Sequence, residues 1–301
     1  MGLVVLLVVD IALVLLAFRS PLHRPADPAS AALSESAVAS GPATSGPTGT
    51  APGSSGLDLS RRVALVLFDT EKAWRLTQGS CEAGGAELAV TTNGGKTWRS
   101  VTPPLRVVTS LSVTDENHVQ IVGGGEGCAT VTRRTADGGT TWTAGAAWTA
   151  WALNPGTPGQ VLNPSGKALG PCASAGAVEV QSAAPAAAVV LCSNGKLLDT
   201  ADTGGTWADL SKVLEVRAVD ATLSAGKLVA TVAYRAEGCS GLQTGTVTGG
   251  ALTKLGCVDL GQTTSSTGST ALAMRADRVW LLVGTALWRS SDGGKTWSAV
   301  G

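Results

Sequence analysis

The sequence predicts an all-β protein made of about six small sheets of similar size. Four stretches repeat one pattern, namely TTNGGKTW (91–98), TADGGTTW (135–142), TADTGGTW (200–207) and SSDGGKTW (290–297). The distance between the first two matches the length of one small antiparallel sheet. The composition agrees, because 39 glycines and only 15% charged residues suit a chain with many tight turns.

Charge and motif content exclude several classes of protein. The 301-residue chain carries 22 basic and 22 acidic side chains, with no basic stripe, so nucleic acid is not an expected partner. The two histidines, His23 and His118, form no HExxH motif, and the six cysteines form no CxxC motif. GxSxG and P-loop motifs are missing as well. We therefore expect no cofactor and no metal.

The chain begins with an apolar segment. Residues 3–18, LVVLLVVDIALVLLAF, are interrupted only by Asp10 and reach about 24 Å as a helix, slightly less than a hydrocarbon core of about 30 Å. A cleaved signal peptide is the alternative, but no small-x-small cleavage site lies close after the apolar run. We expect residues 1–18 to be an uncleaved transmembrane signal anchor. Arg19 and Arg24 favour a cytoplasmic location for the rest of the chain, whereas the cysteines favour the extracytoplasmic side, which we expect.

Residues 19–57 come next and are rich in Pro, Ala, Ser, Thr and Gly. Such a segment buries too little apolar surface to offset its ordering entropy, so it is predicted to be a disordered linker. Its root-mean-square span is about 35 Å, which is enough to hold a domain clear of a membrane.

The four repeated octets share the pattern [ST]-x-[DN]-x-G-x-T-W. Asp and Asn side chains accept hydrogen bonds from backbone N–H groups one or two residues on, and glycine supplies the positive φ of a tight turn. The tryptophan then packs back over the hairpin. Every position is thus explained by shape. The residues of the pattern are Thr91, Asn93, Gly95, Thr97, Trp98; Thr135, Asp137, Gly139, Thr141, Trp142; Thr200, Asp202, Gly204, Thr206, Trp207; and Ser290, Asp292, Gly294, Thr296, Trp297.

This pattern resembles the Asp-box, or BNR repeat, of sialidases, of sortilin-type receptors and of propellers of the photosystem II assembly-factor type. The resemblance covers the four octets and their surroundings. It implies a β-propeller over residues 58–301 and a structural role for the octet aspartates. A shared fold does not by itself imply an activity.

The spacing of the octets gives the number of blades. Third-position residues are separated by 44 residues between Asn93 and Asp137, by 65 up to Asp202 and by 90 up to Asp292. One, two and two blades fit these intervals. We expect a degenerate third blade, and a last blade that borrows its outer strand from residues near 58–63. The six predicted blades span residues 58–103, 104–146, 147–174, 175–213, 214–258 and 259–301, with seven blades as the alternative if the strand near 61–67 belongs elsewhere.

Six cysteines suit three disulfides in an oxidising compartment, with free thiols in a cytosolic protein as the alternative. Cys81, Cys128 and Cys239 each end the second strand of a repeat. We predict Cys81–Cys128 between neighbouring blades, Cys172–Cys192 between blades three and four, and Cys239–Cys257 within blade five. The sequence alone permits fifteen connectivities.

Enzyme activity of the sialidase kind finds little support in the sequence. Sialidases of this type use an arginine triad, an Arg-Ile-Pro motif and a Tyr–Glu pair, whereas this chain has no Arg-Ile-Pro and only one tyrosine, Tyr234. Glu237 is three residues away, which is not the arrangement of the family. Other glycoside hydrolases need two carboxylates about 5–10 Å apart. An arginine cluster with two facing carboxylates at the mouth of the central tunnel would indicate an enzyme.

The preferred interpretation is a membrane-anchored, extracytoplasmic and non-catalytic propeller that binds a protein partner. The alternative is a cell-envelope protein that binds a glycan or hydrolyses it as a sialidase does. Contact residues are expected on loops away from the octets. The candidates are Glu126, Tyr234, Arg235 and Glu237, with Arg75 and Arg106 as further choices.

Overall fold

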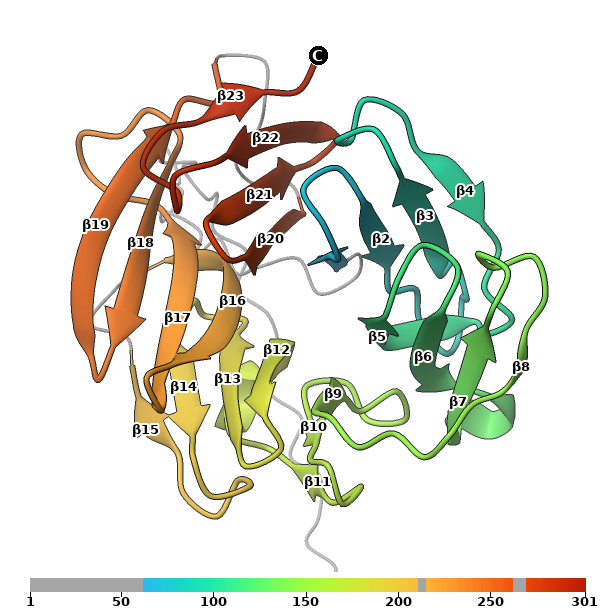
Figure 1. Cartoon of the computed structure of the whole chain (residues 1–301). Coiled ribbons are helices and arrows are strands. Elements are labelled where there is room, and N and C mark those ends of the chain that lie inside the picture. The colour runs from blue at the N-terminus through green and yellow to red at the C-terminus, as the bar shows by residue number, and fades with distance from the viewer. Residues whose placement is uncertain (1–61, 211–214, 262–268) are drawn as a thin grey trace, which may run out of the picture. The chain divides into compact units, whose positions relative to one another are not determined.

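The computed structural model describes residues 62–210, 215–261 and 269–301, so the predicted anchor (1–18) and linker (19–57) lie outside the described residues. The described residues form six antiparallel sheets arranged in a ring (Figure 1), which confirms the predicted six-bladed β-propeller. The seven-bladed alternative is wrong, because the strand at 63–67 belongs to the first sheet.

The blades are numbered in chain order, and their strands hydrogen-bond in sequence order from the inside of the ring outward. Blade 1 contains β1 (Val63–Leu67), β2 (Ala73–Thr77), β3 (Glu87–Thr91) and β4 (Arg99–Val101); blade 2, β5 (Val107–Val113), β6 (Val119–Gly124), β7 (Thr130–Thr135) and β8 (Thr143–Ala144); blade 3, β9 (Ala152–Leu153), β10 (Val161–Leu162) and β11 (Ala168–Leu169); blade 4, β12 (Ala177–Ala184), β13 (Ala187–Cys192), β14 (Leu197–Thr200) and β15 (Ala208–Asp209); blade 5, β16 (Val216–Ser224), β17 (Lys227–Tyr234), β18 (Leu242–Thr248) and β19 (Ala251–Val258); and blade 6, β20 (Thr270–Arg275), β21 (Arg278–Val283), β22 (Ala286–Ser290) and β23 (Ser298–Ala299). Two short 3₁₀ helices, η1 (Glu126–Cys128) and η2 (Ala173–Ala175), lie in loops.

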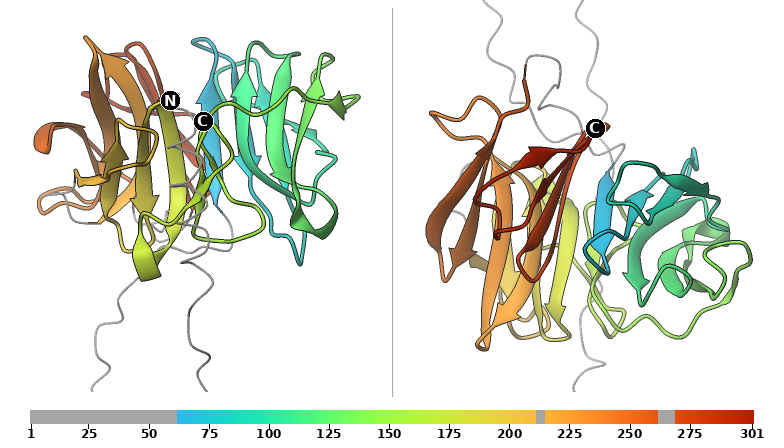
Figure 2. Two further views of the ribbon diagram at one scale, coloured as in Figure 1. Left: turned by 90° about the horizontal axis from the view of Figure 1, so that it is seen from below. Right: turned by 45° about the horizontal axis from the view of Figure 1, so that its top comes forward.

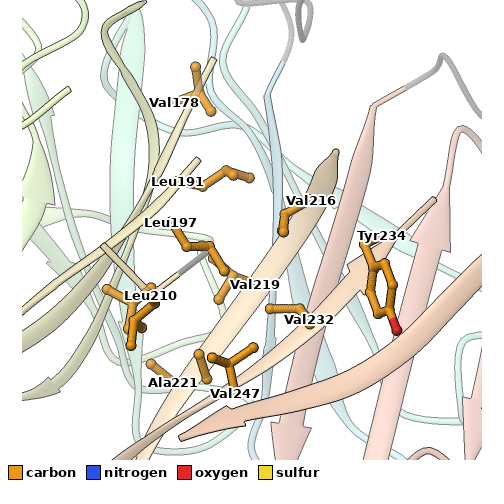
Figure 3. Packing of buried hydrophobic residues seen from close by; sticks show 12 residues of the cluster. Val178, Leu191, Leu197, Leu210, Val216, Val219, Ala221, Val232, Tyr234 and Val247 are labelled. Carbon is orange, nitrogen blue, oxygen red and sulfur yellow. The ribbon is translucent and has the colours of Figure 1, made fainter. Parts of the chain in front are cut away.

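Buried apolar clusters lie between neighbouring blades. One of them packs β12–β14 of blade 4 against β16–β18 of blade 5, with Leu191, Leu197 and Val219 among its members (Figure 3). Equivalent clusters join blades 1 and 2, 5 and 6, 6 and 1, and 3 and 4. Strands such as β13 are buried along their whole length because a blade covers each of their two faces, so they are continuously apolar.

The ring closes by packing and by side-chain contacts. β1 packs beside β20, which brings the first and last blades together. The prediction that residues near 58–63 complete the last blade is wrong for the described residues. Val63 instead pairs with Thr77 at the inner edge of blade 1, and blade 6 takes its outer strand, β23, from its own chain end.

The side chain of Arg289, in blade 6, contacts blade 1 at this junction. Its guanidinium donates to both carboxylate oxygens of Glu71 at 2.6 and 3.2 Å, and to the carbonyl oxygens of Thr70 and Gly94 at 2.8 and 3.4 Å. The same guanidinium stacks over Trp280, 5.0 Å from the ring centroid. A planar group with five donors can make all of these contacts together.

Strands run between two faces of the ring, which Figure 2 shows from the side. We call them the octet face, where the octets join the third and fourth strands of blades 1, 2, 4 and 6, and the disulfide face, where the loops between second and third strands lie. The predicted pairs Cys81–Cys128, Cys172–Cys192 and Cys239–Cys257 are confirmed, and all three bridges lie on the disulfide face.

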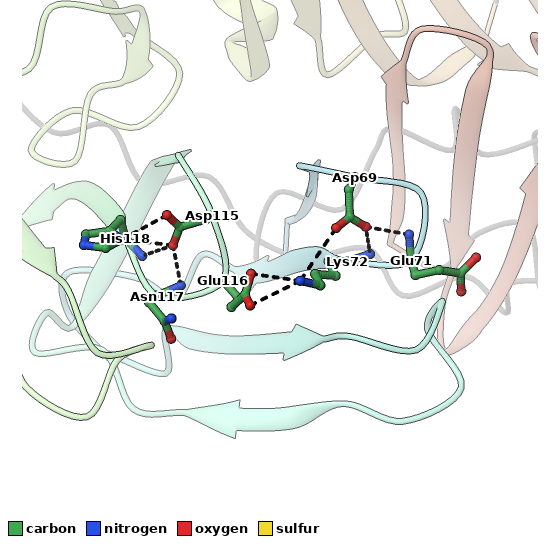
Figure 4. A network of polar contacts seen from close by, with 7 residues as sticks. All are labelled: Asp69, Glu71, Lys72, Asp115, Glu116, Asn117 and His118. Atoms are coloured by element: carbon green, nitrogen blue, oxygen red, sulfur yellow. Dashed lines mark hydrogen bonds and ion pairs between the residues drawn. The ribbon is translucent and has the colours of Figure 1, made fainter.

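The turns after β1 and β5 on the octet face share one hydrogen-bond pattern, in which an aspartate carboxylate accepts two backbone N–H groups (Figure 4). Asp69 Oδ1 accepts the N–H groups of Glu71 and Lys72, both at 2.7 Å. Asp115 Oδ1 likewise accepts the N–H groups of Asn117 and His118, at 2.8 and 2.9 Å. The Lys72 ammonium then reaches the Glu116 carboxylate at 3.1 Å and joins the turns of blades 1 and 2.

Each octet forms the predicted hairpin, but with a wider turn. In each one the side-chain oxygen of the third residue accepts the N–H of the seventh residue at 2.9–3.0 Å. The first-position hydroxyl donates to this oxygen and accepts the N–H of the glycine at position five. The expectation that the acid bonds backbone groups one or two residues on is thus wrong. Its partner lies four residues on, because glycine at position five extends the turn in a left-handed conformation, with φ between 84° and 89°.

The octets also join blades 1, 2, 4 and 6 to the blade that precedes each of them. A Cβ at the fifth-position glycine would meet an aliphatic side chain of the preceding blade, and a carbonyl oxygen of each octet accepts a side-chain hydrogen bond from that blade. The glycine contacts are Gly95 with Leu287, Gly139 with Val101, Gly204 with Leu169, and Gly294 with Leu255. The hydrogen bonds run from Arg289 to Gly94, Arg99 to Gly138, Asn163 to Thr203, and Thr244 to Gly294.

Blade 3 has three strands, which agrees with the prediction of a degenerate repeat. Its β9–β10 loop lies at the disulfide face, where the Pro155 carbonyl oxygen is 3.3 Å from Cys81 Sγ. Its β10–β11 turn lies at the octet face, where Asn163 donates to the Thr203 carbonyl of blade 4 at 3.2 Å. The three strands therefore run like the second, third and fourth strands of other blades. The connector 145–151 stands in the sequence where the first strand is missing.

Candidate functional site

A buried ion pair crosses the ring from blade 1 to blade 4. Arg62, just before β1, donates from Nη2 to Glu179 Oε2 at 3.2 Å and from Nε to the Val178 carbonyl oxygen at 3.1 Å. The other oxygen of Glu179 accepts Gln181 Nε2 at 3.0 Å. Arg62 and Glu179 are only 6% and 7% exposed, so water screens their attraction little. The pair ties opposite blades together at the axis.

Asp220, in β16 of the next blade, is a second carboxyl inside an apolar strand and is half-buried. Its Oδ2 accepts the Met274 N–H at 2.6 Å, and its Oδ1 accepts the Ala221 N–H at 2.7 Å. Burial raises the pKa of Asp220 to about 6 against the opposing effect of these two amides. Burial likewise raises the pKa of Glu179 to about 7, against the opposing effect of Arg62 and with a smaller contribution from the charge of Asp220. Both carboxyls therefore change protonation near neutral pH.

The chemistry available to this axial cluster is limited by its contacts. Each carboxyl already accepts hydrogen bonds from protein groups; Glu179 is buried and Asp220 is half-buried. General acid–base catalysis needs a carboxyl within hydrogen-bonding reach of a bound substrate. The arrangement instead joins blades 1 and 4 through side-chain contacts and holds protons near neutral pH.

The octet aspartates have the opposite electrostatics. The Thr141 hydroxyl and amide hold the pKa of Asp137 at about 2, and the Thr206 amide and hydroxyl hold that of Asp202 at about 2. The Thr296 hydroxyl lowers the pKa of Asp292 in the same way. These carboxylates stay ionised and fully occupied with their own turns, as the structural interpretation predicts.

The disulfide face carries exposed charges on loops held by disulfides. Arg106, between β4 and β5, donates to the Glu82 carbonyl oxygen at 2.7 Å. Glu215 lies 3.4 Å from the buried Arg217 and 4.0 Å from the exposed Arg235. Such preorganised charged loops suit recognition of another macromolecule more than chemistry on a small substrate.

Four of the six predicted contact residues are exposed on this face, but they form two separate groups. Arg106 and Glu126 belong to the loops of blades 1 and 2, on the opposite side of the ring from Arg235 and Glu237 of blade 5.

The expectation that Tyr234 and Arg75 lie on exposed loops is wrong. Tyr234 is 4% exposed and packs in the core between blades 4 and 5 (Figure 3), where burial raises its pKa. Arg75 lies in β2 and not on a loop, with its guanidinium 5.0 Å from the ring centroid of the octet residue Trp98. The sequence places Tyr234 at a strand end but does not show that the neighbouring blade covers it.

The axial residues were missed by sequence reasoning. Glu179 and Asp220 are single acids inside apolar strands, in the stretches AVEVQ and RAVDATL, and this is the signal that could have found them. A lone acid within a buried strand needs a partner. The partner of Glu179 is 117 residues away, so no local pattern indicates it.

The described residues contain no group of three or more His, Cys, Asp or Glu side chains placed to hold a metal ion. None of the helices within residues 62–210, 215–261 and 269–301 is long and apolar enough to cross a membrane.

Comparison with known proteins assigns neither a family nor a function to this chain. No protein-family model matches the chain, and no curated protein matches its sequence. Among solved structures, YCF48 bound to D1 peptide is 20% identical, with a TM-score of 0.29 over 81% of this chain and 83% of that chain. The SapL1 lectin in complex with alpha methyl fucoside is 11% identical, with a TM-score of 0.47 over 82% and 97%. The GH74 enzyme of Niastella koreensis is 16% identical, with a TM-score of 0.30 over 78% of this chain but only 37% of that chain.

Proposed function

We propose that this chain is a membrane-tethered, extracytoplasmic scaffold that binds a protein partner through its disulfide face and catalyses no reaction. The observation that carries the proposal is the unequal use of the two faces. The octet face is occupied with joining blades, whereas the loops of the disulfide face are held by three disulfides and expose charges. Loops fixed on a rigid scaffold are the usual location of binding residues.

The proposed location rests on two features of the chain. Three disulfides suit an oxidising, extracytoplasmic compartment. The apolar segment 3–18 followed by the linker 19–57 suits a tether. The likeness of the octets to the Asp-box is consistent with a propeller that binds, since these residues are committed to turns.

Crosslinking of the full-length protein in intact cells, with capture and mass spectrometry, tests the proposal. We expect one dominant protein partner for the wild-type chain. Charge reversal on the disulfide face, with Arg106→Glu, Glu126→Arg and Arg235→Glu, should abolish its capture. The matched control reverses exposed charges of the octet face, with Lys96→Glu and Lys295→Glu, and should leave capture unchanged.

Two results would overturn this proposal. One is equal loss of the partner from the octet-face control, which would place binding on the wrong face. The other is the lack of any reproducible protein partner.

Binding of a cell-envelope glycan is the second candidate, favoured by an open cavity between blades 2 and 3. Hydrolysis of the sialidase kind has less support, because Tyr234 is buried and the axial carboxyls are occupied by protein groups.

A further inference from the structure

Arg75, in the second strand of blade 1, departs from the pattern of the octet blades. In each of these blades one second-strand residue pairs with the first octet residue, and the residue two positions later points to the same face of the sheet. That later residue is Ile121 in blade 2, Val190 in blade 4 and Leu281 in blade 6, and each is fully buried against the preceding blade. In blade 1 it is Arg75. A charged group thus stands where the other octet blades use an apolar one for packing.

The Arg75 guanidinium is held in place without a hydrogen bond. It stacks over the indole of the octet residue Trp98, 5.0 Å from the ring centroid, and this contact fixes the plane of the cation. The side chain is half-buried, and within the described part of the chain it makes no hydrogen bond and no ion pair. An arginine carries five N–H donors. Those of Arg75 are available to a ligand.

The face of blade 1 that carries Arg75 is the one that packs against blade 6. Ala73, two residues before Arg75, belongs to the buried cluster that joins blades 6 and 1, and Trp98 packs against the same cluster. Leu76 and Leu88 point the other way and belong to the cluster with blade 2. On β2 the cluster with blade 6 therefore ends at Ala73.

A cavity of about 290 Å³ takes the place of apolar packing from Arg75 onward, toward the disulfide face. The strand pairing aligns Arg75, Ala89 and Ser100 in one row across this face of blade 1, and Thr77 with Glu87 in the next row. All five residues line the cavity. The pairing and the cavity lining thus agree that these side chains share one site.

The cavity offers donors and acceptors but no net charge. Arg75 supplies N–H groups, Glu87 supplies carboxylate oxygens, and the hydroxyl groups of Thr77, Ser100 and Thr102 both donate and accept. Glu87 repels an anion, which offsets the attraction of Arg75 for a carboxylate or phosphate. A neutral ligand with several adjacent hydroxyl groups uses both charges, because each hydroxyl donates and accepts. The volume lies near the lower limit for small-molecule sites and suits a single ring.

We infer that this cavity binds one neutral sugar unit, a pyranose ring, of a glycan. Arg75 donates to oxygen atoms of the sugar, Glu87 accepts from its hydroxyl groups, and the hydroxyls of the two rows complete the contacts. Trp98 is a positioning residue, because it holds the guanidinium of Arg75. This inference rests on the second candidate function, glycan binding, and assigns it to a cavity other than the one between blades 2 and 3.

Titration calorimetry of the oxidised full-length protein with D-glucose, D-galactose and D-mannose tests the inference. We expect saturable binding of at least one of these neutral sugars. D-glucuronate, measured in the same way, separates a sugar site from an anion site. We expect it to bind no more tightly than the best neutral sugar, because Glu87 opposes its carboxylate.

Two variants and a matched control make the test specific. Arg75→Leu should weaken sugar binding by about tenfold to hundredfold, as the loss of hydrogen bonds to a charged donor predicts. Its urea midpoint should not fall, because the other octet blades carry apolar residues at this position. Glu87→Gln, at an exposed residue, should also weaken binding. The control is Arg134→Leu, at an exposed arginine of β7 that does not line the cavity, and its affinity should equal that of the wild type.

Four results would overturn the inference. None of the three neutral sugars binds; glucuronate binds more tightly than all of them; Arg75→Leu or Glu87→Gln binds as well as the Arg134→Leu control; or Arg75→Leu lowers the urea midpoint, which would give Arg75 a structural role. Sugar binding that survives Arg75→Leu refutes this site but not glycan binding by the chain. Capture of a protein partner is a separate measurement, so failure here is distinct from failure of the proposed scaffold function.

Discussion

Replacement of the axial ion pair tests whether Arg62 and Glu179 act as one unit. The variants are Arg62→Met, Glu179→Met and the double substitution. Methionine matches the glutamate side chain in length, is about two atoms shorter than arginine, and carries no charge. Arg62 and Glu179 belong to blades 1 and 4, so the cycle also measures how strongly opposite blades are coupled through the axis.

The magnitude depends on the burial of the pair. With only 6% and 7% of the two residues exposed, removal of Glu179 leaves an uncompensated cation away from water, which costs about 3–5 kcal/mol. Gln181 also loses the acceptor at 3.0 Å, at a further cost of about 1 kcal/mol. The double variant removes both charges, and buried pairs replaced in this way are about neutral or are stabilised by about 1–4 kcal/mol. We expect each single variant to be less stable than the double variant.

Urea unfolding of the oxidised full-length protein, monitored by tryptophan fluorescence, gives the four free energies of unfolding for this cycle. It should be run at pH 8.5, where Glu179 is ionised because its pKa is about 7, and again at pH 5.5, where Glu179 is mostly neutral. The coupling energy should fall at the lower pH. Additive single-variant losses at pH 8.5 would refute the idea of a coupled pair across the axis.

Three further outcomes are expected from the joints and from the titrating groups. In urea unfolding, Gly95→Ala should destabilise the protein by about 1–3 kcal/mol more than Gly85→Ala. Both glycines have positive φ, but only at Gly95 would the added Cβ meet Leu287 of the preceding blade. Equal losses would refute the idea that this glycine joins blades 6 and 1. Stability should fall as the pH is lowered from about 4 through 2, because the octet aspartates have lowered pKa values in the folded state. Their contribution to stability is present above the unfolded pKa and is lost as they are protonated. Acid titration monitored by circular dichroism measures this loss, and constant stability over this range would contradict the prediction. Stability should also decrease as the pH rises from about 4.5 to 7, by up to about 1.4 kcal/mol per unit, because Glu179 binds its proton more tightly in the folded state; Glu179→Gln should reduce this slope, and an unchanged slope would contradict the assignment.

The sequence predicted the parts of this fold that depend on short segments of the chain. The octets repeat four times, so the blade number, the degenerate third blade and the cysteine positions can all be derived from spacing. Contacts across the ring have no such signature. Arg62 and Glu179 are separated by 117 residues, and the burial of Tyr234 depends on a neighbouring blade. The sequence also contains no sign of the cavity beside Trp148, because this cavity lies where blade 3 lacks a strand and a regular octet.

Regular and irregular repeats contribute differently to the ring. A regular octet supplies a glycine and a carbonyl that the preceding blade needs, so four octets commit four junctions to packing. Blade 5 has no octet either, yet its long strands β18 and β19 and a buried cluster fill the junction with blade 4. Only blade 3 combines a degenerate turn with a missing strand. The ring tolerates a cavity where one repeat departs from the pattern, because the regular repeats already hold it together.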